Sequence, residues 1–99
     1  MGWKVLVTAP YMQLAIERFR AGLEERGIEL LVPQVNERFE EGELLQWISD
    51  VDGVICGDDR FTRGVLLAAP RLKVLSKWGT GIDSIDLEAC QELGVAVRN

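Results

Sequence analysis

The segment from Lys77 to Asp83 combines residue types and a spacing that could hold an anion. It reads Lys77-Trp78-Gly79-Thr80-Gly81-Ile82-Asp83. Glycines at alternate positions allow successive backbone N–H groups to point into one concavity that suits a carboxylate, and Lys77 adds a positive charge nearby. The same glycines would also serve a tight connection that needs positive φ angles. The spacing alone leaves both interpretations open, an anion-binding loop and a plain turn.

A second polar cluster, Asp58-Asp59-Arg60, follows an apolar segment. Two carboxylates that work together need convergent geometry, and adjacent side chains do not normally point at one ligand. We therefore interpret Asp58 and Asp59 as a solvated turn and helix-cap pair. Arg60 is the member of this cluster that could meet an anion, because a guanidinium matches the geometry of carboxylates and phosphates.

The chain contains no histidine, the side chain that most often acts as an acid or base near neutral pH. Histidine triads, the usual zinc sites and histidine-assisted hydride transfer are therefore excluded within these residues. Cys56 and Cys90 lie outside the spacing of Cys-x-x-Cys and zinc-finger motifs, so we expect two reduced core thiols. No glycine-rich dinucleotide motif or phosphate loop occurs, so neither a metal nor a nucleotide cofactor is predicted in this chain.

The elements that must position these residues follow from the hydrophobic pattern. Near-continuous apolar runs alternate with segments in which apolar residues recur every three or four positions, which indicates strands alternating with helices. The expected strands cover residues 3–9, 28–33, 51–57, 72–77 and 95–98. The expected helices follow Pro10, cover residues 43–49 and 87–93, and run from Thr62 to Ala69.

The expected helices have identifiable ends and inward faces. Gly27 and Gly94 stand where a glycine ends a helix, and Thr62 and Asp86 stand where a side chain caps one. The apolar positions expected to face the sheet are Met12, Ala15, Ile16, Phe19, Leu23, Leu44, Leu45 and Ile48.

Strict alternation of strands and helices predicts a doubly wound, flavodoxin-like α/β fold, because right-handed crossovers place helices on both faces of a parallel sheet. The expected order of the five strands is 2-1-3-4-5. In such a sheet, ligands bind beyond the carboxyl ends of the strands, near the point where the strand order reverses. The loops at residues 8–12, 57–60 and 77–82 are therefore the candidate ligand-binding loops.

Length and charge limit the possible classes of function. A chain of 99 residues forms one domain and has no room for a second core. It carries 11 Lys and Arg against 16 Asp and Glu, a formal charge of −5, which opposes binding to nucleic acid or to an anionic membrane. No apolar run approaches the ~20 residues that span a bilayer, and the first residues lack the pattern of a signal peptide. A cytoplasmic protein is therefore expected.

The second half of the chain resembles a known family. Gly79-Thr-Gly-Ile-Asp-Ser-Ile-Asp-Leu-Glu-Ala89 with Gly94-Val-Ala-Val-Arg-Asn99 is similar to the substrate-binding domain of NAD-dependent D-2-hydroxyacid dehydrogenases. The D-3-phosphoglycerate dehydrogenase branch is the most similar. Val51-Asp-Gly-Val-Ile-Cys56 and Phe61-Thr-Arg-Gly-Val-Leu66 extend the similarity, whereas residues 1–50 agree only in element order.

The resemblance implies that the backbone N–H groups of Trp78, Gly79 and Thr80 bind the substrate carboxylate, with Lys77 as a neighbouring cation. It also implies that the catalytic residues and the NAD-binding fingerprint lie beyond Asn99, with a return helix that completes this domain. Members of the phosphoglycerate branch often carry an Arg just after the third strand that binds the substrate phosphate. Gly57 stands at that position here, and Arg60 is an approximate substitute for the missing Arg. The implied substrate-binding residues are Lys77, Trp78, Gly79, Thr80, Gly81 and Arg60.

Two functions follow as hypotheses. In the first, residues 1–99 are a single flavodoxin-like substrate-binding domain, a fragment that lacks the nucleotide-binding domain. This fragment binds a small 2-hydroxy or 2-keto acid, phosphorylated or not, and is inactive alone. The parent enzyme would use NAD.

In the second hypothesis, the chain is a standalone or engineered binding module. Without the return helix one sheet face would be apolar and open, so we expect a homodimer, with domain swapping as one form of it.

Overall fold

The computed structural model describes residues 2–35, 38–78 and 84–98, and its strands form one sheet. The strands are β1 (Trp3–Val7), β2 (Ile28–Leu31), β3 (Gly53–Cys56), β4 (Val74–Lys77) and β5 (Ala96–Arg98). Their order is β2-β1-β3-β4-β5, and each neighbouring pair is parallel. The predicted α/β fold and strand order are confirmed.

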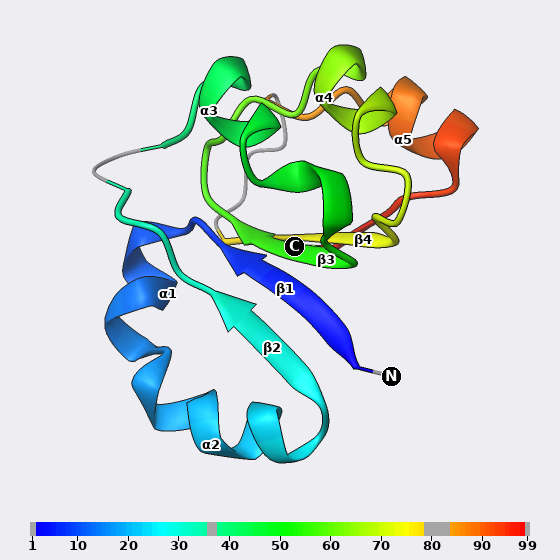
Figure 1. Ribbon diagram of the computed structural model, residues 1–99. Coiled ribbons are helices and arrows are strands. Elements are labelled where there is room, and N and C mark those ends of the chain that lie inside the picture. The colour runs from blue at the N-terminus through cyan, green and yellow to red at the C-terminus, as the bar shows by residue number, and fades with distance from the viewer. Residues whose placement is uncertain (1, 36–37, 79–83, 99) are drawn as a thin grey trace.

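Helices lie on both faces of the sheet (Figure 1). One face carries α3 (Glu41–Leu45), α4 (Arg63–Leu67) and α5 (Leu87–Leu93), with a 3₁₀ turn over Ile48–Asp50. The other face carries α1 (Pro10–Ala15) and α2 (Glu17–Glu25), which lie beside β1 and β2. This arrangement follows from right-handed crossovers between parallel strands. None of these described helices is long and apolar enough to cross a membrane.

The core is divided by the sheet into two clusters. The larger one lies under α3, α4 and α5 and includes the fully buried strand residues Leu6, Val54 and Leu75. The smaller one lies under α1 and α2 and is built on Val7 and Ile16 together with other side chains of the first two strands. Alternate residues of β1 point to opposite faces, so Leu6 and Val7 contribute to different clusters.

The second face of the sheet is only partly covered. Helices α1 and α2 extend over β1 and β2 and reach β3 at Ile55, and the described part of the chain places no helix over β4 on that side (Figure 1). An apolar groove of about 250 Å³ follows the uncovered face. This open sheet face has the apolar character expected from the sequence. Its groove is lined by Trp3, Val5, Leu23, Ile28, Leu30, Gly53, Val54, Ile55, Val74 and Ser76.

The segment after Pro10 differs from the expected single helix. The helix is interrupted at Ile16, where the N–H of Phe19 donates to the Ile16 carbonyl at 2.9 Å in a tighter i to i+3 turn. Ile16 is buried, whereas Phe19, expected to face the sheet, is 50% exposed. The reason is that α2 lies at the edge of the open sheet face, so its far side has no partner surface. Leu45 of α3, also expected inward, is similarly exposed, while Leu44 is fully buried.

The predicted helix ends are confirmed at four positions. The Thr62 hydroxyl accepts a hydrogen bond from the Val65 N–H at 3.3 Å, and the Asp86 carboxylate accepts one from the Ala89 N–H at 3.0 Å. Gly27 and Gly94 have φ angles of +80° and +74°, which side chains with a Cβ rarely adopt. These ends fix the chain direction into β2, α4, α5 and β5.

Candidate functional site

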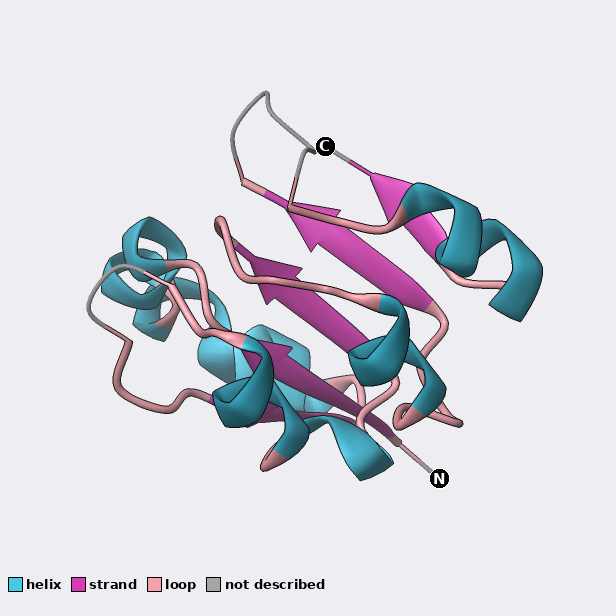
Figure 2. Cartoon of the chain, turned by 90° about the horizontal axis from the view of Figure 1, so that it is seen from above, coloured by secondary structure: helices cyan, strands magenta, loops and turns pink. Residues whose placement is uncertain are grey.

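The carboxyl ends of β1, β3 and β4 lie at one edge of the sheet (Figure 2). The strand order reverses here, because β1 is paired with β2 on one side and with β3 on the other. The N–H groups of Thr8 and Ala9 both donate to the Ile55 carbonyl, at 2.9 and 3.2 Å, which ends the β1 ladder and starts the turn. This carboxyl edge is the candidate functional site.

Asp59 is completely buried at this edge, so its interpretation as a solvated turn residue is wrong. Its carboxylate accepts a hydrogen bond from the Thr8 hydroxyl at 2.6 Å and from the Phe39 N–H at 2.5 Å. A third bond comes from the Gly57 N–H at 3.1 Å. These donors replace water and allow the charge to be buried. Asp59 thereby joins the loops after β1 and β3 to the segment before α3.

Lys77, at the end of β4, is buried and forms an ion pair with Asp58. Only 3% of the Lys77 side chain is exposed, whereas 74% of the Asp58 side chain is exposed. The two side chains meet at 2.9 Å between Lys77 Nζ and Asp58 Oδ1, and Nζ also donates to the Trp78 carbonyl at 3.4 Å. The cation therefore reaches the carboxyl edge from within the molecule, and the Asp58 carboxylate lies between it and solvent.

Trp78 contributes a side chain to the edge rather than a backbone N–H. Its N–H, which the resemblance assigned to the substrate carboxylate, donates to the Cys56 carbonyl at 2.8 Å. The indole is half exposed and lines an apolar groove of about 480 Å³ that continues toward α2. The groove is lined by Met12, Ala15, Arg18, Phe19, Leu23, Ile55 and Trp78.

Arg60 lies in the same loop as Asp58 and Asp59 but faces a different partner. Its N–H donates to the Phe39 carbonyl at 3.1 Å, and its Nε lies 4.0 Å from Glu40 Oε1. Arg38 Nε contacts the other Glu40 oxygen at 2.7 Å. The Arg60 side chain is half exposed, so it remains accessible to an anion in solution.

Gly79, Thr80 and Gly81 lie outside the described residues, which resume at Ser84. On the near side of that segment, the N–H of Trp78 is held by β3. On the far side, Ile85 forms a parallel bridge with the buried Phe61, whose N–H donates to the Ser84 carbonyl at 3.0 Å. Both flanks of residues 79–83 are therefore attached to the carboxyl edge.

The two cysteines are buried and free, which agrees with the expected core thiols. Burial raises the pKa of Cys56 to about 12, and burial likewise raises the pKa of Cys90. A thiol that stays protonated is a poor nucleophile. Throughout the described ranges, no three Cys, Asp or Glu side chains are arranged to hold a metal ion.

The carboxyl edge does not fit the pyrophosphate of NAD at the turn after β1. Dinucleotide sites use free backbone N–H groups at the start of a helix. Here the N–H groups of Thr8 and Ala9 are bonded to Ile55, and α1 begins with Pro10, which has no N–H. These three positions therefore offer no free backbone N–H to a phosphate.

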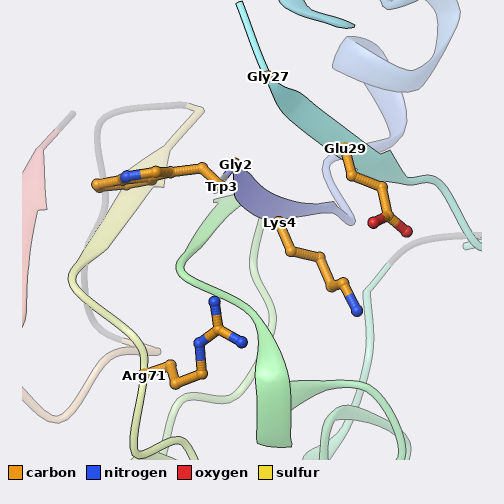
Figure 3. Close-up of a pocket in the computed structure, with 6 residues that line it drawn as sticks. All are labelled: Gly2, Trp3, Lys4, Gly27, Glu29 and Arg71. Carbon is orange, nitrogen blue, oxygen red and sulfur yellow. The ribbon is translucent and has the colours of Figure 1, made fainter.

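A further polar cavity, of about 390 Å³, lies at the opposite, amino edge of the sheet (Figure 3). Lys4 and Arg71 point into it, and Glu29 lies beside Lys4. Its cations already have partners, because Lys4 Nζ binds Asp50 at 2.8 Å and Arg71 Nη2 binds Asp52 at 3.3 Å. This internal pairing leaves the cavity no unpaired cation for an anionic ligand among the residues named, and the cavity lies at the edge opposite to the point where the strand order reverses.

Sequence reasoning missed the network around Asp59 because its donors are distant along the chain. Thr8 is 51 residues away and Phe39 is 20 residues away. A local signal was the position of Asp59 two residues after Gly57, whose N–H donates to its carboxylate. The pairing of Asp58 with Lys77, 19 residues apart, was equally hidden until the parallel pairing of β3 and β4 was known.

Comparison with known proteins supports the family resemblance. The model of the family described as D-isomer specific 2-hydroxyacid dehydrogenase, catalytic domain, matches residues 5–99. D-3-phosphoglycerate dehydrogenase of Methanocaldococcus jannaschii is 39% identical over 98 residues, which cover 97% of this chain and 17% of that protein. Glyoxylate reductase of Thermococcus onnurineus is 30% identical over 97 residues, which cover 97% of this chain and 28% of that protein.

A solved structure gives the same result for the fold. The NAD⁺-bound 3-phosphoglycerate dehydrogenase of Entamoeba histolytica superposes with a TM-score of 0.83 and 27% identity. The match covers 98% of this chain and 32% of that chain, so the chain spans about a third or less of these relatives. The family resemblance inferred from the sequence motif is confirmed. The chain belongs to the family of D-isomer specific 2-hydroxyacid dehydrogenases.

Proposed function

We propose that residues 1–99 are the substrate-binding portion of an NAD-dependent D-2-hydroxyacid dehydrogenase. The chain binds the carboxylate of a small 2-hydroxy or 2-keto acid at the carboxyl edge, beyond β3 and β4. The observation that carries this proposal is Lys77, a buried cation at the end of β4 whose Nζ meets Asp58 of the loop after β3 at the carboxyl edge. A buried cation needs an anionic partner, and a substrate carboxylate can take the place of the exposed Asp58 carboxylate.

Each candidate residue has a role in this proposal. Lys77 attracts the carboxylate, and the half-exposed indole of Trp78 borders the carboxyl edge from the opposite face of β4, beside its groove. Following the resemblance, Gly79 and Thr80 donate backbone N–H groups to the carboxylate, and Gly81 completes the loop. Arg60 meets a second polar group of the substrate at the rim.

The whole enzyme's reaction needs parts that these residues do not provide. The turn after β1 does not fit NAD, so the cofactor and the acid–base residues belong to a nucleotide-binding domain elsewhere in a longer, cytoplasmic protein. We therefore propose that the 99-residue chain binds the acid but does not reduce or oxidise it. Oxidation of NADH with pyruvate by the purified chain alone would contradict this part of the proposal.

Binding is tested by titrating the ¹⁵N-labelled chain with D-glycerate and pyruvate while the amide resonances of Lys77 and Trp78 are followed. We expect saturable shifts at these residues. Lys77→Met should weaken binding about tenfold or more, because a hydrogen bond to a charged group is lost. Lys73→Met removes an exposed lysine at the opposite edge and serves as the matched control. Unchanged affinity in Lys77→Met, or equal losses in both variants, would contradict the proposed site.

A second candidate function is a standalone module that self-associates, as a homodimer or a domain-swapped dimer. The observation that favours it is the open sheet face, with Trp3, Phe19 and Trp78 exposed along two apolar grooves. Contiguous apolar surface of this kind is usually covered by another chain. The two functions are compatible, because the open sheet face and Lys77 occupy opposite faces of β4.

A further inference from the structure

We propose that Asp58 is a specificity-determining residue that screens Lys77 and disfavours acids carrying a second anionic group such as a phosphate. The inference rests on the proposed function, since it concerns the acid that the same carboxyl edge accepts. It names the substrate class more narrowly as an unphosphorylated 2-hydroxy or 2-keto monocarboxylate. The carrying observation is the ion pair of Asp58 with the buried Lys77, at 2.9 Å.

Lys77 requires a negatively charged partner in the free protein. Its side chain is 3% exposed, and an ammonium removed from water is costly unless it is paired. Asp58 supplies that partner from the adjacent loop. A ligand carboxylate has the same charge and the same acceptor geometry as Asp58, so it can take over the Nζ hydrogen bond without leaving the cation unpaired.

Asp58 is the exposed member of the pair, and the residue that follows it is anchored by hydrogen bonds. The side chain is 74% exposed and can rotate into solvent without being buried elsewhere. The next residue, Asp59, is held by Thr8, Phe39 and Gly57 through three hydrogen bonds. When a ligand displaces the Asp58 carboxylate, that carboxylate therefore stays within the same loop and keeps its negative charge at the rim of the site.

A second anionic group on the ligand meets further negative charge at this rim. Glu40 lies between Arg38 and Arg60, so the cation that could serve a phosphate already faces a carboxylate. Gly57 provides no side-chain charge at the end of β3. Beside Arg38, Arg60 and Lys77 lie the carboxylates of Glu40 and Asp58, and Asp59 is buried in the same loop. A dianionic phosphate gains no net attraction there, and repulsion from Asp58 weakens its binding.

The test compares two ligands that differ only in the phosphate, D-glycerate and 3-phospho-D-glycerate, with inorganic phosphate as a third probe. Affinities are measured at low ionic strength by calorimetry and by the amide shifts of Lys77 and Trp78. We expect the unmodified chain to bind D-glycerate about tenfold more tightly than 3-phosphoglycerate. Asp58→Asn should bind 3-phosphoglycerate and inorganic phosphate about tenfold more tightly than the unmodified chain, with a smaller gain for D-glycerate.

Asp50→Asn is the matched control, because Asp50 is also an exposed partner of a lysine at 2.8 Å, but at the amino edge. The substitution changes the net charge equally and should leave all three affinities unchanged. Asp58→Ser is a second variant, and the dispersion of the amide spectrum reports whether each variant is folded. The double variant Asp58→Asn, Lys77→Met should lose the gained phosphate affinity.

The outcomes separate this inference from the proposed function. If both Asp58 variants bind 3-phosphoglycerate and inorganic phosphate no better than Asp50→Asn does, the role of Asp58 is overturned. A phosphate gain that persists without Lys77 overturns it as well. If no protein binds D-glycerate or pyruvate while the Asp58 variants gain phosphate, the proposed function fails and the screening of Lys77 by Asp58 stands.

Discussion

At the scale of single residues, two adjacent carboxylates at the carboxyl edge occupy opposite environments. Asp58 is exposed and pairs with Lys77, whereas Asp59 is fully buried and receives three hydrogen bonds from Thr8, Phe39 and Gly57. Asp59 thus has a structural role that supports the loop from which Asp58 acts. A buried acceptor with satisfied hydrogen bonds is costly to alter, whereas an exposed one is free to exchange partners.

Asp59→Asn should destabilise the chain by about 1–3 kcal/mol. The Asn amide has one oxygen in place of two, so its NH₂ group would face a backbone N–H that now donates to the carboxylate. Urea denaturation followed by circular dichroism measures the change in the free energy of unfolding. Asp50→Asn, at an exposed position, is the control and should leave the midpoint nearly unchanged. Equal midpoints for the two variants would show that the Asp59 network does not stabilise the fold.

At the scale of elements, Asp52 connects the starts of three strands. Its carboxylate accepts the Lys4 N–H of β1 at 2.8 Å, and its N–H donates to the Lys4 carbonyl at 2.7 Å. Its own carbonyl accepts the N–H of Lys73, next to β4, at 2.8 Å. The hydrogen bond from the Lys4 backbone N–H, assisted by the charge of Arg71, holds the pKa of the Asp52 carboxyl below its ordinary value.

This lowered pKa predicts an acid-dependent loss of stability. The folded state binds fewer protons than the unfolded state, so Asp52 stabilises the fold above the unfolded pKa of about 3.9, and this contribution is lost as the pH falls through the folded pKa. Asp52→Asn should therefore be less stable at pH 7 and should show a shallower decline between about pH 5 and pH 2. The measurement is urea unfolding across that range. Glu29→Gln, an exposed carboxylate at the same edge, should keep the slope of the unmodified chain.

The sheet was predictable from the sequence because its signals are local. Alternating apolar runs gave the five strands, and Gly27, Thr62, Asp86 and Gly94 marked helix ends through their own backbone or nearest turn. The break at Ile16 was not predictable, because helical periodicity continues through it and only packing against the smaller core cluster decides it.

The candidate site was predictable in place but not in detail. The loops and Lys77 followed from the switch-point rule and the glycine spacing. The burial of Asp59 and the partner of Lys77 depend on residues 51 and 19 positions away, which meet only when the parallel strands pair. The N–H of Trp78 was misassigned for the same reason, since its acceptor, the Cys56 carbonyl, lies on the neighbouring strand.

At the scale of the whole molecule, the two faces of the sheet are covered unequally. Helices α3, α4 and α5 cover one face, whereas α1 and α2 extend over β1 and β2 and reach β3 at Ile55 (Figure 1). The remaining surface is apolar and has two grooves, of about 250 and 480 Å³. Burial of apolar surface yields roughly 25 cal/mol per Å², so covering this open sheet face provides a driving force for association.

We therefore expect the 99-residue chain to dimerise through the open sheet face. Phe19→Gln removes a half-exposed aromatic side chain from the edge of that face and should weaken the dimer about tenfold. Leu67→Gln, at an exposed apolar position on α4 across the sheet, is the matched control and should leave association unchanged. Light scattering and sedimentation over a range of concentrations measure the dimer fraction. A monomer at high concentration, or equal effects of the two substitutions, would contradict association through this face.

The open sheet face and the carboxyl edge meet at Trp78, so dimerisation should also alter the amide resonance of that residue. Lys77 is directed to the other face, so the dimer should bind D-glycerate with the same affinity as the monomer.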